Sequence, residues 1–193
     1  MEKPDFHFPA LLKKCKRGGP AVTHPKDAGL VIAYTGIGKD SVVMELGSGS
    51  GFMTIQLANI VKHVTTYEKR KEFQELAMQN VKKAGLTNVE FKLRDVFEGI
   101  DEKEVDLIFC DVAEPEKIIN EMHNAIRIGG FMSAHCLNIE QAKALHLAAE
   151  KVFKEVFTLD CLVKDYDVRE FGTRPKHFGL MHTAYMVFAR KST

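Results

Sequence analysis

The sequence predicts an α/β fold: a doubly wound, mostly parallel sheet with an antiparallel hairpin at its C-terminal end. Three observations lead to this prediction. From about residue 27 onward, short apolar segments alternate with segments of helical periodicity. A Gly-rich loop directly follows the first apolar segment. Two extended segments with no helical pattern between them end the chain, and this arrangement is typical of a hairpin.

The individual elements follow from local signals. Lys71–Ala84 repeats apolar residues at helical spacing, and Gly85 behind it is the residue type that ends helices in the left-handed conformation. Pro115 and Asn138 are residue types that begin helices, and Asn138 is a candidate N-cap. We expect strands at Val42–Leu46, Val64–Glu68, Val89–Leu93, Val105–Asp111 and Phe131–His135, and helices at Phe52–Lys62, Lys71–Ala84, Pro115–Ile126 and Asn138–Val152.

Glycine and proline mark the turns of the C-terminal half. We expect the strand at Phe131–His135 to be entered through a turn at Gly129–Gly130. Thr158–Glu170 and Thr183–Ala189 look extended, and the segment between them contains Gly172–Pro175. We therefore expect a hairpin whose two strands are joined by a long irregular connection.

The length and composition fit one globular domain. The chain has 193 residues, of which 45% are hydrophobic and 27% charged, and this is enough to bury a core. No apolar run approaches the roughly 18–20 residues that a membrane span needs. The four cysteines are scattered without a CxxC pair, and no pair of histidines has the spacing of a metal site. We expect reduced thiols, no metal, no membrane segment and a cytoplasmic protein.

Basic residues gather at both ends of the chain. Residues 1–26 carry a net charge of +4 and residues 162–193 a net charge of +3, so that the middle carries −6 although the whole chain is at +1. Basic ends on an acidic body favour a polyanionic partner such as a nucleic acid. Charge alone leaves the alternative open that these residues only solvate the surface.

Four predicted strands end in residues that suit a ligand, and ligands of such sheets bind at the carboxyl ends of the strands. The loop Gly47–Gly51 allows a tight turn and a close approach of the ligand to the main chain. Glu68 can accept hydrogen bonds from two ribose hydroxyls, and Asp95 can receive an adenine amino group. Asp111 ends the central strand. The alternatives are a turn without a ligand, a solvated Glu68, and helix caps at Asp95 and Asp111.

Three further segments are more distinctive than the Gly-rich loop. They are His24-Pro25-Lys26-Asp27-Ala28-Gly29, Asp95-Val96-Phe97-Glu98-Gly99, and a tail with Arg174-Pro175-Lys176 and His182-Thr183-Ala184-Tyr185. Together with the GSGSG loop, Glu68 and Asp111, they resemble the tRNA (adenine-N1)-methyltransferases of the archaeal and bacterial homo-oligomeric type. This family is part of the class I S-adenosylmethionine-dependent methyltransferases. The resemblance covers roughly residues 10–191.

The resemblance implies a seven-stranded sheet and methyl transfer from S-adenosyl-L-methionine to N1 of adenosine in the T-loop of tRNA. The product of the donor is S-adenosyl-L-homocysteine, the partner is tRNA, and the implied assembly is a homotetramer. The implied cofactor-binding residues are Gly47, Ser48, Gly49, Ser50, Gly51, Glu68, Asp95, Val96 and Asp111. The implied RNA-binding residues are Lys13, Lys14, Lys16, Arg17, Arg169, Arg174, Lys176 and His182.

Two of these residues have a chemical role that can be stated. Asp111 is the expected catalytic residue, because a carboxylate near N1 and N6 of adenine stabilises the positive charge that methylation leaves on the base. The same position would suit a general base. His182 lies in the tail that the resemblance brings near the mouth of the active site. His182 could instead be a structural hydrogen-bond donor.

The chain departs from the family in two places. The family usually carries a separate N-terminal β domain, whereas residues 1–23 are enough only for a short basic arm ahead of a methyltransferase domain at 24–193. The family also tends to place an aromatic residue after the Pro of the fourth-strand motif, and here Glu116 follows Pro115. These departures bear on tRNA affinity and on base stacking.

Three other functions remain as alternatives. A methyltransferase for a small molecule or a protein is favoured by the missing N-terminal domain and disfavoured by the tail segments. A non-catalytic tRNA-binding partner subunit is disfavoured because the chain keeps the Gly-rich loop and the acidic strand ends. The G-x-G-x-G spacing and the closing hairpin disfavour a nicotinamide-dependent dehydrogenase.

Overall fold

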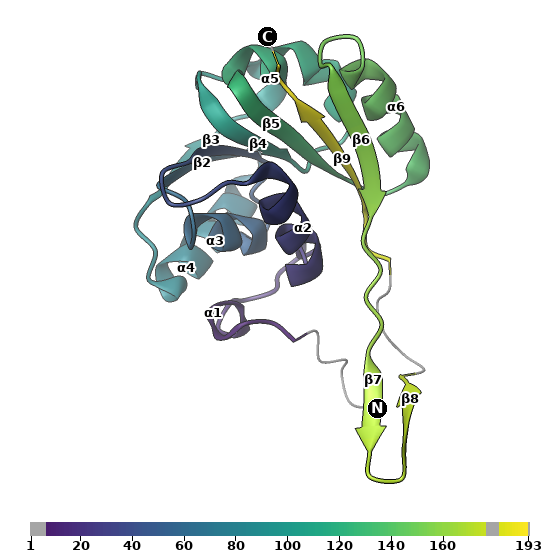
Figure 1. The fold of residues 1–193 in the computed structure, drawn as a ribbon. Coiled ribbons are helices and arrows are strands. Elements are labelled where there is room, and N and C mark those ends of the chain that lie inside the picture. Colours follow the sequence, from purple (N-terminus) through teal and green to yellow (C-terminus); the bar gives the residue numbers. More distant parts are fainter. Residues whose placement is uncertain (1–6, 177–181, 193) are drawn as a thin grey trace.

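A seven-stranded sheet forms the centre of the computed structural model, which describes residues 7–176 and 182–192. Its strands are β1 (Val42–Leu46), β2 (His63–Glu68), β3 (Val89–Leu93), β4 (Val105–Cys110), β5 (Ile126–Cys136), β6 (Glu155–Asp160) and β9 (Tyr185–Arg190). They lie in the order β3-β2-β1-β4-β5-β9-β6 (Figure 1). The strands β1 to β5 pair in parallel, and β9 pairs antiparallel to both β5 and β6. The predicted mostly parallel sheet with an antiparallel C-terminal hairpin is confirmed.

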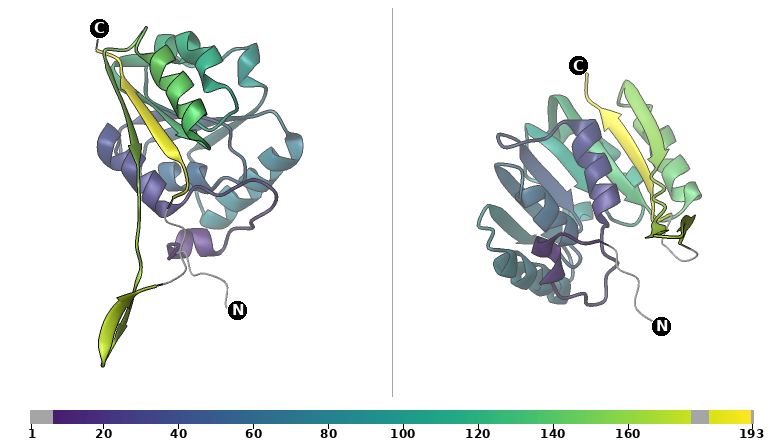
Figure 2. Two further views of the ribbon diagram at one scale, coloured as in Figure 1. Left: turned by 90° about the vertical axis from the view of Figure 1, so that its right-hand side faces the viewer. Right: turned by 60° about the horizontal axis from the view of Figure 1, so that its bottom comes forward.

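Helices cover both faces of this sheet (Figures 1 and 2). The helices α2 (Pro25–Thr35), α3 (Phe52–Ala58) and α4 (Lys71–Ala84) lie on one face, and α5 (Ile119–Ala125) and α6 (Ile139–Ala149) lie on the other. Each face has its own apolar core, because the buried strands send alternate side chains to both sides. None of the helices in the described part of the chain is long and apolar enough to cross a membrane.

The segment before α2 is packed onto the domain. The short helix α1 (Ala10–Lys13) buries Leu12, and Phe8 ahead of it is also buried. Both side chains join an apolar cluster with Phe52 of α3 and Val81 of α4. The lysines of this segment are therefore held in place relative to the sheet, since the chain on which they sit is anchored by burial of Phe8 and Leu12.

Most of the predicted elements are confirmed, and some differ in extent. The helix Lys71–Ala84 is found as predicted, and Gly85 behind it has a φ of 76°. The side chain of Asn138 accepts a 2.8 Å hydrogen bond from the amide of Gln141, which confirms it as the N-cap of α6. The helix at Phe52 already ends at Ala58. The segment from Pro115 begins as a 3₁₀ helix, η2 (Pro115–Ile118), before α5 starts.

The predicted turn at Gly129–Gly130 is wrong. Both glycines lie inside β5, which already begins at Ile126. The pairing of β4 with β5 shifts register between Val105 and Leu107. A Cβ atom on Gly130 would lie 2.9 Å from the carbonyl oxygen of Asp106, so the glycine is required by the close approach of β4 and not by a turn.

The predicted irregular connection near the C-terminus is also wrong in part. Instead of one extended segment, β6 ends at Asp160, and a separate strand β7 (Tyr166–Arg169) pairs antiparallel with β8 (Gly172–Pro175). This two-stranded hairpin projects away from the domain (Figures 1 and 2). Both strands are only 4 residues long and largely exposed, so they carry no alternating apolar pattern. Residues 177–181 of the same connection lie outside the described part of the chain.

Candidate active site

A cavity of about 370 Å³ opens where the strands β1, β2, β3, β4 and β5 end. This is the sheet edge at which the sequence predicts a ligand, because parallel strands bring their carboxyl ends together. The expected cofactor residues that line the cavity are Gly47, Ser48, Gly49, Ser50, Glu68, Asp95, Val96 and Asp111. Gly51 is not part of the lining.

The Gly-rich loop turns sharply between β1 and α3. Gly47 has a φ of 98°, and a Cβ atom there would lie 2.5 Å from the carbonyl oxygen of Asp111. Gly51 has a φ of 80°, and its Cβ atom would lie 3.0 Å from the Cα of Ala77 in α4. Gly51 therefore serves the packing of the loop against α4, whereas Gly47 lets the loop approach the end of β4.

Two hydroxyls of this loop are available to a ligand. The Oγ atoms of Ser48 and Ser50 are buried and have no hydrogen-bond partner among the described residues. Both serines line the cavity. Buried hydroxyls are normally paired, so two unpaired ones in a cavity wall indicate a polar ligand at this place.

Glu68 is held in a fixed position at the end of β2. One carboxylate oxygen accepts a 3.1 Å hydrogen bond from the amide of Gly49, and the other accepts one of 3.1 Å from the amide of Arg70. The side chain is only 4% exposed. A solvated Glu68 is therefore excluded, and the carboxylate is a fixed acceptor in the cavity wall.

Asp95 ends the segment that follows β3 and caps η1 (Val96–Glu98). Its Oδ1 accepts a 3.1 Å hydrogen bond from the amide of Phe97. Its Oδ2 lies 3.4 Å from Nζ of Lys69. The capping alternative is thus present in the structure, and Asp95 lies in the cavity wall as well.

Asp111 follows β4 directly and is not a helix cap. The N-cap of η2 is Glu114, which has a φ of 55°. The amide of Asp111 donates a 2.8 Å hydrogen bond to the carbonyl of Leu46, and its side chain is 38% exposed. The carboxylate therefore lies in the cavity wall with access to solvent, as expected for a group that contacts a substrate.

His135 is a site residue that the sequence did not predict. It lies near the end of β5, lines the cavity, and is 8% exposed. Its Nδ1 atom lies 3.6 Å from Oδ1 of Asp111. Its one sequence signal is its position at the end of the predicted strand Phe131–His135, and no motif marks it.

Glu45 is the second missed residue. It lies in β1, is fully buried, and lines the cavity. Its Oε2 accepts hydrogen bonds of 2.5 Å from Thr54 and 2.6 Å from Thr66, while Oε1 has no partner among the described residues. The pKa of Glu45 is raised to about 7, mainly by burial. The nearby carboxylates of Asp111 and Glu68 contribute to the rise, and the two hydroxyl bonds oppose it.

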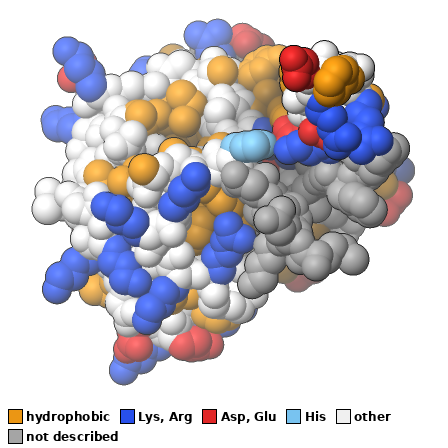
Figure 3. Space-filling model, turned by 90° about the horizontal axis from the view of Figure 1, so that it is seen from below, with side chains coloured by type: hydrophobic (Ala, Val, Ile, Leu, Met, Phe, Trp, Pro, Cys, Tyr) orange, Lys and Arg blue, Asp and Glu red, His pale blue; other side chains and the backbone are white. Residues whose placement is uncertain are grey.

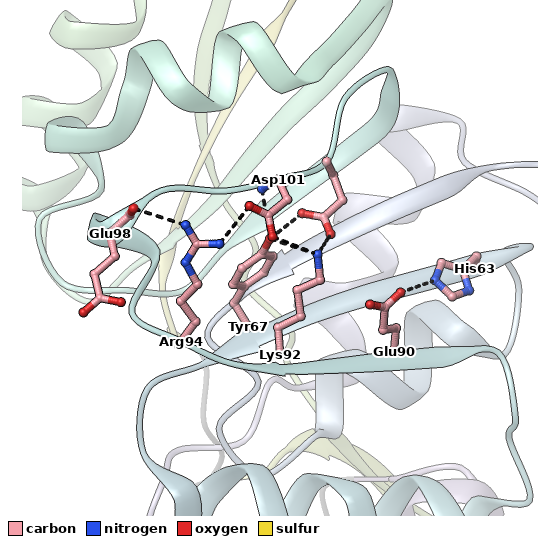
Figure 4. Close-up of polar contacts among 8 residues, drawn as sticks. His63, Tyr67, Glu90, Lys92, Arg94, Glu98 and Asp101 are labelled. Carbon is pink, nitrogen blue, oxygen red and sulfur yellow. Dashed lines mark hydrogen bonds and ion pairs between the residues drawn. The ribbon is translucent and has the colours of Figure 1, made fainter.

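A polar network supports the wall of the cavity next to Asp95. The buried Tyr67 of β2 donates a 2.5 Å hydrogen bond to Glu102, and Lys92 of β3 donates one of 2.5 Å to the same carboxylate (Figure 4). Burial and the bond to Glu102 raise the pKa of Tyr67. Burial opposes the charge of Glu102, but the bonds from Lys92 and Tyr67 outweigh it and lower the pKa of this carboxyl.

The same network continues to Arg94, whose guanidinium donates a 2.8 Å hydrogen bond to Asp101 (Figure 4). The amide of Asp101 in turn donates one of 3.1 Å to the hydroxyl of Tyr67. The loop behind η1 is thus tied to β2 and β3 at several points. Since Tyr67 and Arg94 also line the cavity, these bonds fix the shape of its wall.

The first group of expected RNA-binding residues lies around α1. Lys13, Lys14, Lys16 and Arg17 are exposed, and the guanidinium of Arg17 lies 4.7 Å from the centre of the Phe8 ring. The chain then continues into the cavity wall at Pro20. Figure 3 views the side toward which the parallel strands run, and Lys and Arg side chains gather there.

The second group does not lie at the cavity. Arg169 and Arg174 belong to the projecting hairpin and pair with Asp167, and Lys176 lies 3.3 Å from Asp165. None of these residues lines the cavity. His182 pairs with Asp160 at 3.0 Å and packs against the ring of Tyr185, so it holds the start of β9 beside the end of β6.

No group of three or more His, Cys, Asp or Glu side chains in the described part of the chain is arranged to hold a metal ion. The groups that converge on the cavity are instead a Gly-rich main chain, two unpaired hydroxyls and several carboxylates. This donor set suits an organic ligand that carries ribose hydroxyls and amino groups.

Comparisons with known proteins agree with this chemistry. A family model described as a methyltransferase domain matches residues 37–172. The tRNA (adenine(57)-N(1)/adenine(58)-N(1))-methyltransferase TrmI of Methanocaldococcus jannaschii is 32% identical over 211 residues, which cover 93% of this chain and 74% of that protein.

Two solved structures are similar over almost the whole chain. The tRNA (m1A58) methyltransferase TrmI of Aquifex aeolicus has a TM-score of 0.89 at 26% identity, covering 99% of this chain and 77% of that one. A structure described as an S-adenosylmethionine-dependent O-methyltransferase of Thermotoga maritima has a TM-score of 0.90 at 32% identity, covering 96% and 72%.

Proposed function

The chain belongs to the tRNA (adenine-N1)-methyltransferase family of class I S-adenosylmethionine-dependent methyltransferases, and from this premise we propose that it methylates N1 of adenosine in the T-loop of tRNA. The observation that carries the proposal is the cavity at the strand ends. Its wall combines the Gly-rich loop, the fixed carboxylate of Glu68 and the accessible carboxylate of Asp111. The methyl donor is S-adenosyl-L-methionine, and S-adenosyl-L-homocysteine is its product.

The cofactor-binding residues of this chain have separate tasks. Glu68 accepts hydrogen bonds from the two ribose hydroxyls, and the amide of Gly49 keeps its carboxylate in place. Asp95 and the buried Val96 form the wall for the adenine. The free hydroxyls of Ser48 and Ser50 receive polar groups of the cofactor. When bound, S-adenosyl-L-methionine supplies a methyl group on a positively charged sulfur.

The protein contributes mainly position and electrostatics to the methyl transfer. Asp111 accepts a hydrogen bond from the N6 amino group of the target adenine and orients N1 toward the methyl group. Methylation leaves a positive charge on the base, and the carboxylate of Asp111 stabilises this charge as it develops. Leu137 lies in the cavity wall and is 67% exposed, so it offers the base an apolar surface.

The protein must also bind the tRNA outside the cavity, because the target base has to leave its stack to reach Asp111. The exposed lysines around α1 lie on the side of the domain toward which the parallel strands run (Figure 1) and provide cations that contact phosphates. Lys69 and Arg70 add two more at the rim, with side chains 58% and 52% exposed. Neither residue was among those expected from the sequence.

The projecting hairpin supports self-association of the chain, which we propose to be a tetramer. Two-stranded hairpins that stand alone in water are marginally stable. This one exposes Val168 at 76% and Phe171 at 98%. Packing against a second copy would bury these side chains and bring further basic residues to one tRNA. Sedimentation velocity at micromolar concentration should show an oligomer, and a monomer would contradict this part of the proposal.

The deciding experiment is mass spectrometry of nucleosides from tRNA that has been incubated with the protein and S-adenosyl-L-methionine. We expect N1-methyladenosine to appear while adenosine is lost, and a reaction lacking the methyl donor is the control.

The solved O-methyltransferase with a similar fold makes a small molecule or protein substrate the second candidate. Transfer of labelled methyl groups to components of a cell extract, with no change in the tRNA nucleosides, would support that candidate. No transfer to either pool would favour a non-catalytic partner subunit. A cytoplasmic location, where tRNA and reduced thiols coexist, is part of the proposal.

A further inference from the structure

His135 is a buried imidazole with an unused ring nitrogen at the proposed reaction centre. Its Nδ1 atom has no hydrogen-bond partner among the described residues, although the side chain is only 8% exposed. The same atom lies 3.6 Å from Oδ1 of Asp111, and both residues line the cavity. If a bound substrate moves the Asp111 side chain by a few tenths of an ångström toward His135, the two atoms come within hydrogen-bond distance.

The charged groups around His135 come from two sides. Asp111 lies at the end of β4, and Lys26, Asp27 and His24 belong to α2 and its N-cap. The residue of β9 in register with His135 is Met186, which carries no charge. Burial and the charge of Lys26 lower the pKa of His135. The carboxylates of Asp111 and Asp27 together outweigh them, so the pKa lies above its ordinary value.

We propose that His135 is the positioning residue for Asp111 in the methyl transfer, and that proton uptake by its imidazole slows the reaction. This inference rests on the proposed function and goes beyond it. Neutral His135 with its proton on Nδ1 donates to Oδ1 of Asp111 and leaves the other carboxylate oxygen directed at the N6 amino group of the base. The pair then carries one negative charge, which stabilises the cationic methylated base.

The protonated imidazole keeps this hydrogen bond but cancels the charge of the pair. The positive charge that develops on the adenine then meets a neutral pair, so the transition state loses its electrostatic partner while the geometry is unchanged. The rate should therefore increase as the pH rises through the pKa of His135. Below this pKa it should fall about tenfold per pH unit if only the neutral imidazole is active.

The first experiment needs no substrate. The Cε1 proton of His135 is followed by NMR from pH 5 to 9 in the unmodified protein and in the Asp111→Asn variant, with assignment by the His135→Asn variant. The midpoint of the titration should fall by about one pH unit when Asp111 loses its charge. An unchanged midpoint would overturn the inference, because the two side chains would then not interact.

The second experiment measures single-turnover methylation of tRNA against pH. His135→Asn places an amide donor where Nδ1 was, so this variant should keep the rate of the unmodified protein at high pH and lose the fall at low pH. His135→Phe lacks both the donor and the titrating ring, so it should be at least tenfold slower than the unmodified protein at high pH, should lose the fall at low pH, and should keep its S-adenosyl-L-methionine affinity. His63→Asn is the matched control, because His63 is at the start of β2 and the cavity lies where the strands end.

These outcomes separate the two proposals. A pH profile that stays the same in His135→Asn would overturn the role of His135 while tRNA methylation stands. Absence of methyl transfer to tRNA at every pH, together with a shifted NMR midpoint, would overturn the proposed function, and the pairing of His135 with Asp111 would remain.

Discussion

The hydroxyl of Thr183 donates a 2.6 Å hydrogen bond to the carboxylate of Asp27, and this contact fastens the first turn of α2 to the chain that leads into β9. Nζ of Lys26 donates to the same carboxylate at 2.8 Å and to the carbonyl of Cys161 at 2.7 Å. Asp27 is fully buried, and the Lys26 side chain is 10% exposed. Two distinctive sequence segments, one near each end of the chain, are thus held together by a buried charged cluster.

Loss of the Asp27 charge should destabilise the protein strongly. Asp27→Asn leaves Lys26 buried without a counter-ion, and the expected loss in the free energy of unfolding is about 3–5 kcal/mol. Thr183→Val removes the hydroxyl that donates to Asp27 and accepts from Lys26, and the loss of these two hydrogen bonds should cost about 1–3 kcal/mol. Urea unfolding followed by circular dichroism measures both. Thr173→Val on the exposed strand β8 is the control, and an equal effect there would contradict a special role of the cluster.

Glu45 should make the stability depend on pH in the opposite sense to a paired carboxylate. Its folded pKa of about 7 exceeds the ordinary value of 4.5, so the folded state binds more protons than the unfolded state between these two values. The stability that this group contributes is present below pH 4.5 and is lost as the pH rises to 7. The free energy of unfolding should decrease by about 3 kcal/mol over this range.

Glu45→Gln stays neutral and should remove this loss. The variant should therefore gain stability relative to the unmodified protein as the pH rises from 4.5 to 7, and the difference should be constant above that. Urea unfolding at several pH values measures it, with Glu75→Gln on the exposed face of α4 as the control. A difference that does not change with pH would mean that Glu45 stays charged in the fold.

Much of the sheet was predictable because buried parallel strands are continuous apolar runs. Val42–Leu46 is found as predicted. Val89–Leu93 is found as well, although it is a partly exposed edge strand in which Glu90 and Lys92 alternate with apolar residues. Glu68 and Asp111 lie at the expected edge. The wrong predictions depend on contacts that the local sequence does not contain. Gly130 is of a residue type that is common in turns, but a glycine is needed here because β4 approaches the backbone closely. The segment β8 is a strand only because β7 lies beside it.

The site was predictable residue by residue only where a motif marks it. His135 was not identified because its importance comes from its neighbour Asp111, and their contact depends on the pairing of β4 with β5. Lys69 and Arg70 follow Glu68 directly, but a pair of basic residues at the start of a helix has no distinctive signal. Their place at the cavity rim becomes visible only in the folded chain.

Glu68→Ala should weaken the binding of S-adenosyl-L-methionine. The ribose hydroxyls lose their shared acceptor, and charge-assisted hydrogen bonds of this kind contribute about 1.5–3 kcal/mol, which corresponds to roughly 10- to 150-fold in affinity. Isothermal titration calorimetry measures the change. Glu72→Ala, an exposed carboxylate in the first turn of α4, is the matched control. Unchanged affinity in Glu68→Ala would remove this residue from the site.

Binding of tRNA should weaken with salt, and the lysines around α1 should carry part of that dependence. Replacement of Lys13, Lys14 and Lys16 by Gln should reduce the slope of log affinity against log salt by about 0.7–0.9 for each phosphate contact that is lost. Arg17 stays in this variant because its guanidinium lies over the Phe8 ring and supports the fold.

Three exposed lysines on and after α6 provide a variant with the same change in net charge. Lys143, Lys151 and Lys154 do not line the cavity, and their replacement by Gln should leave the slope nearly unchanged. Fluorescence anisotropy of labelled tRNA from 50 to 300 mM salt measures both variants. Equal slopes for the two would mean that the lysines around α1 only solvate the surface.

Asp111→Asn should slow the chemical step and leave the fold intact. The amide keeps the shape of the side chain but loses the charge that stabilises the methylated base, and removal of one preorganised electrostatic partner costs about a hundredfold or more in turnover. Since the N-cap of η2 is Glu114, the variant should melt at nearly the same temperature as the unmodified protein. Single-turnover methylation of tRNA and melting are measured on the same samples, together with S-adenosyl-L-methionine affinity, which should change far less than the rate. Glu114→Gln is the control, because it makes the same change of charge three residues further along, on a side chain that is 60% exposed and outside the cavity wall. An Asp111→Asn variant that melts early and methylates at the normal rate would make this residue structural, and the electrostatic mechanism would lose its central group.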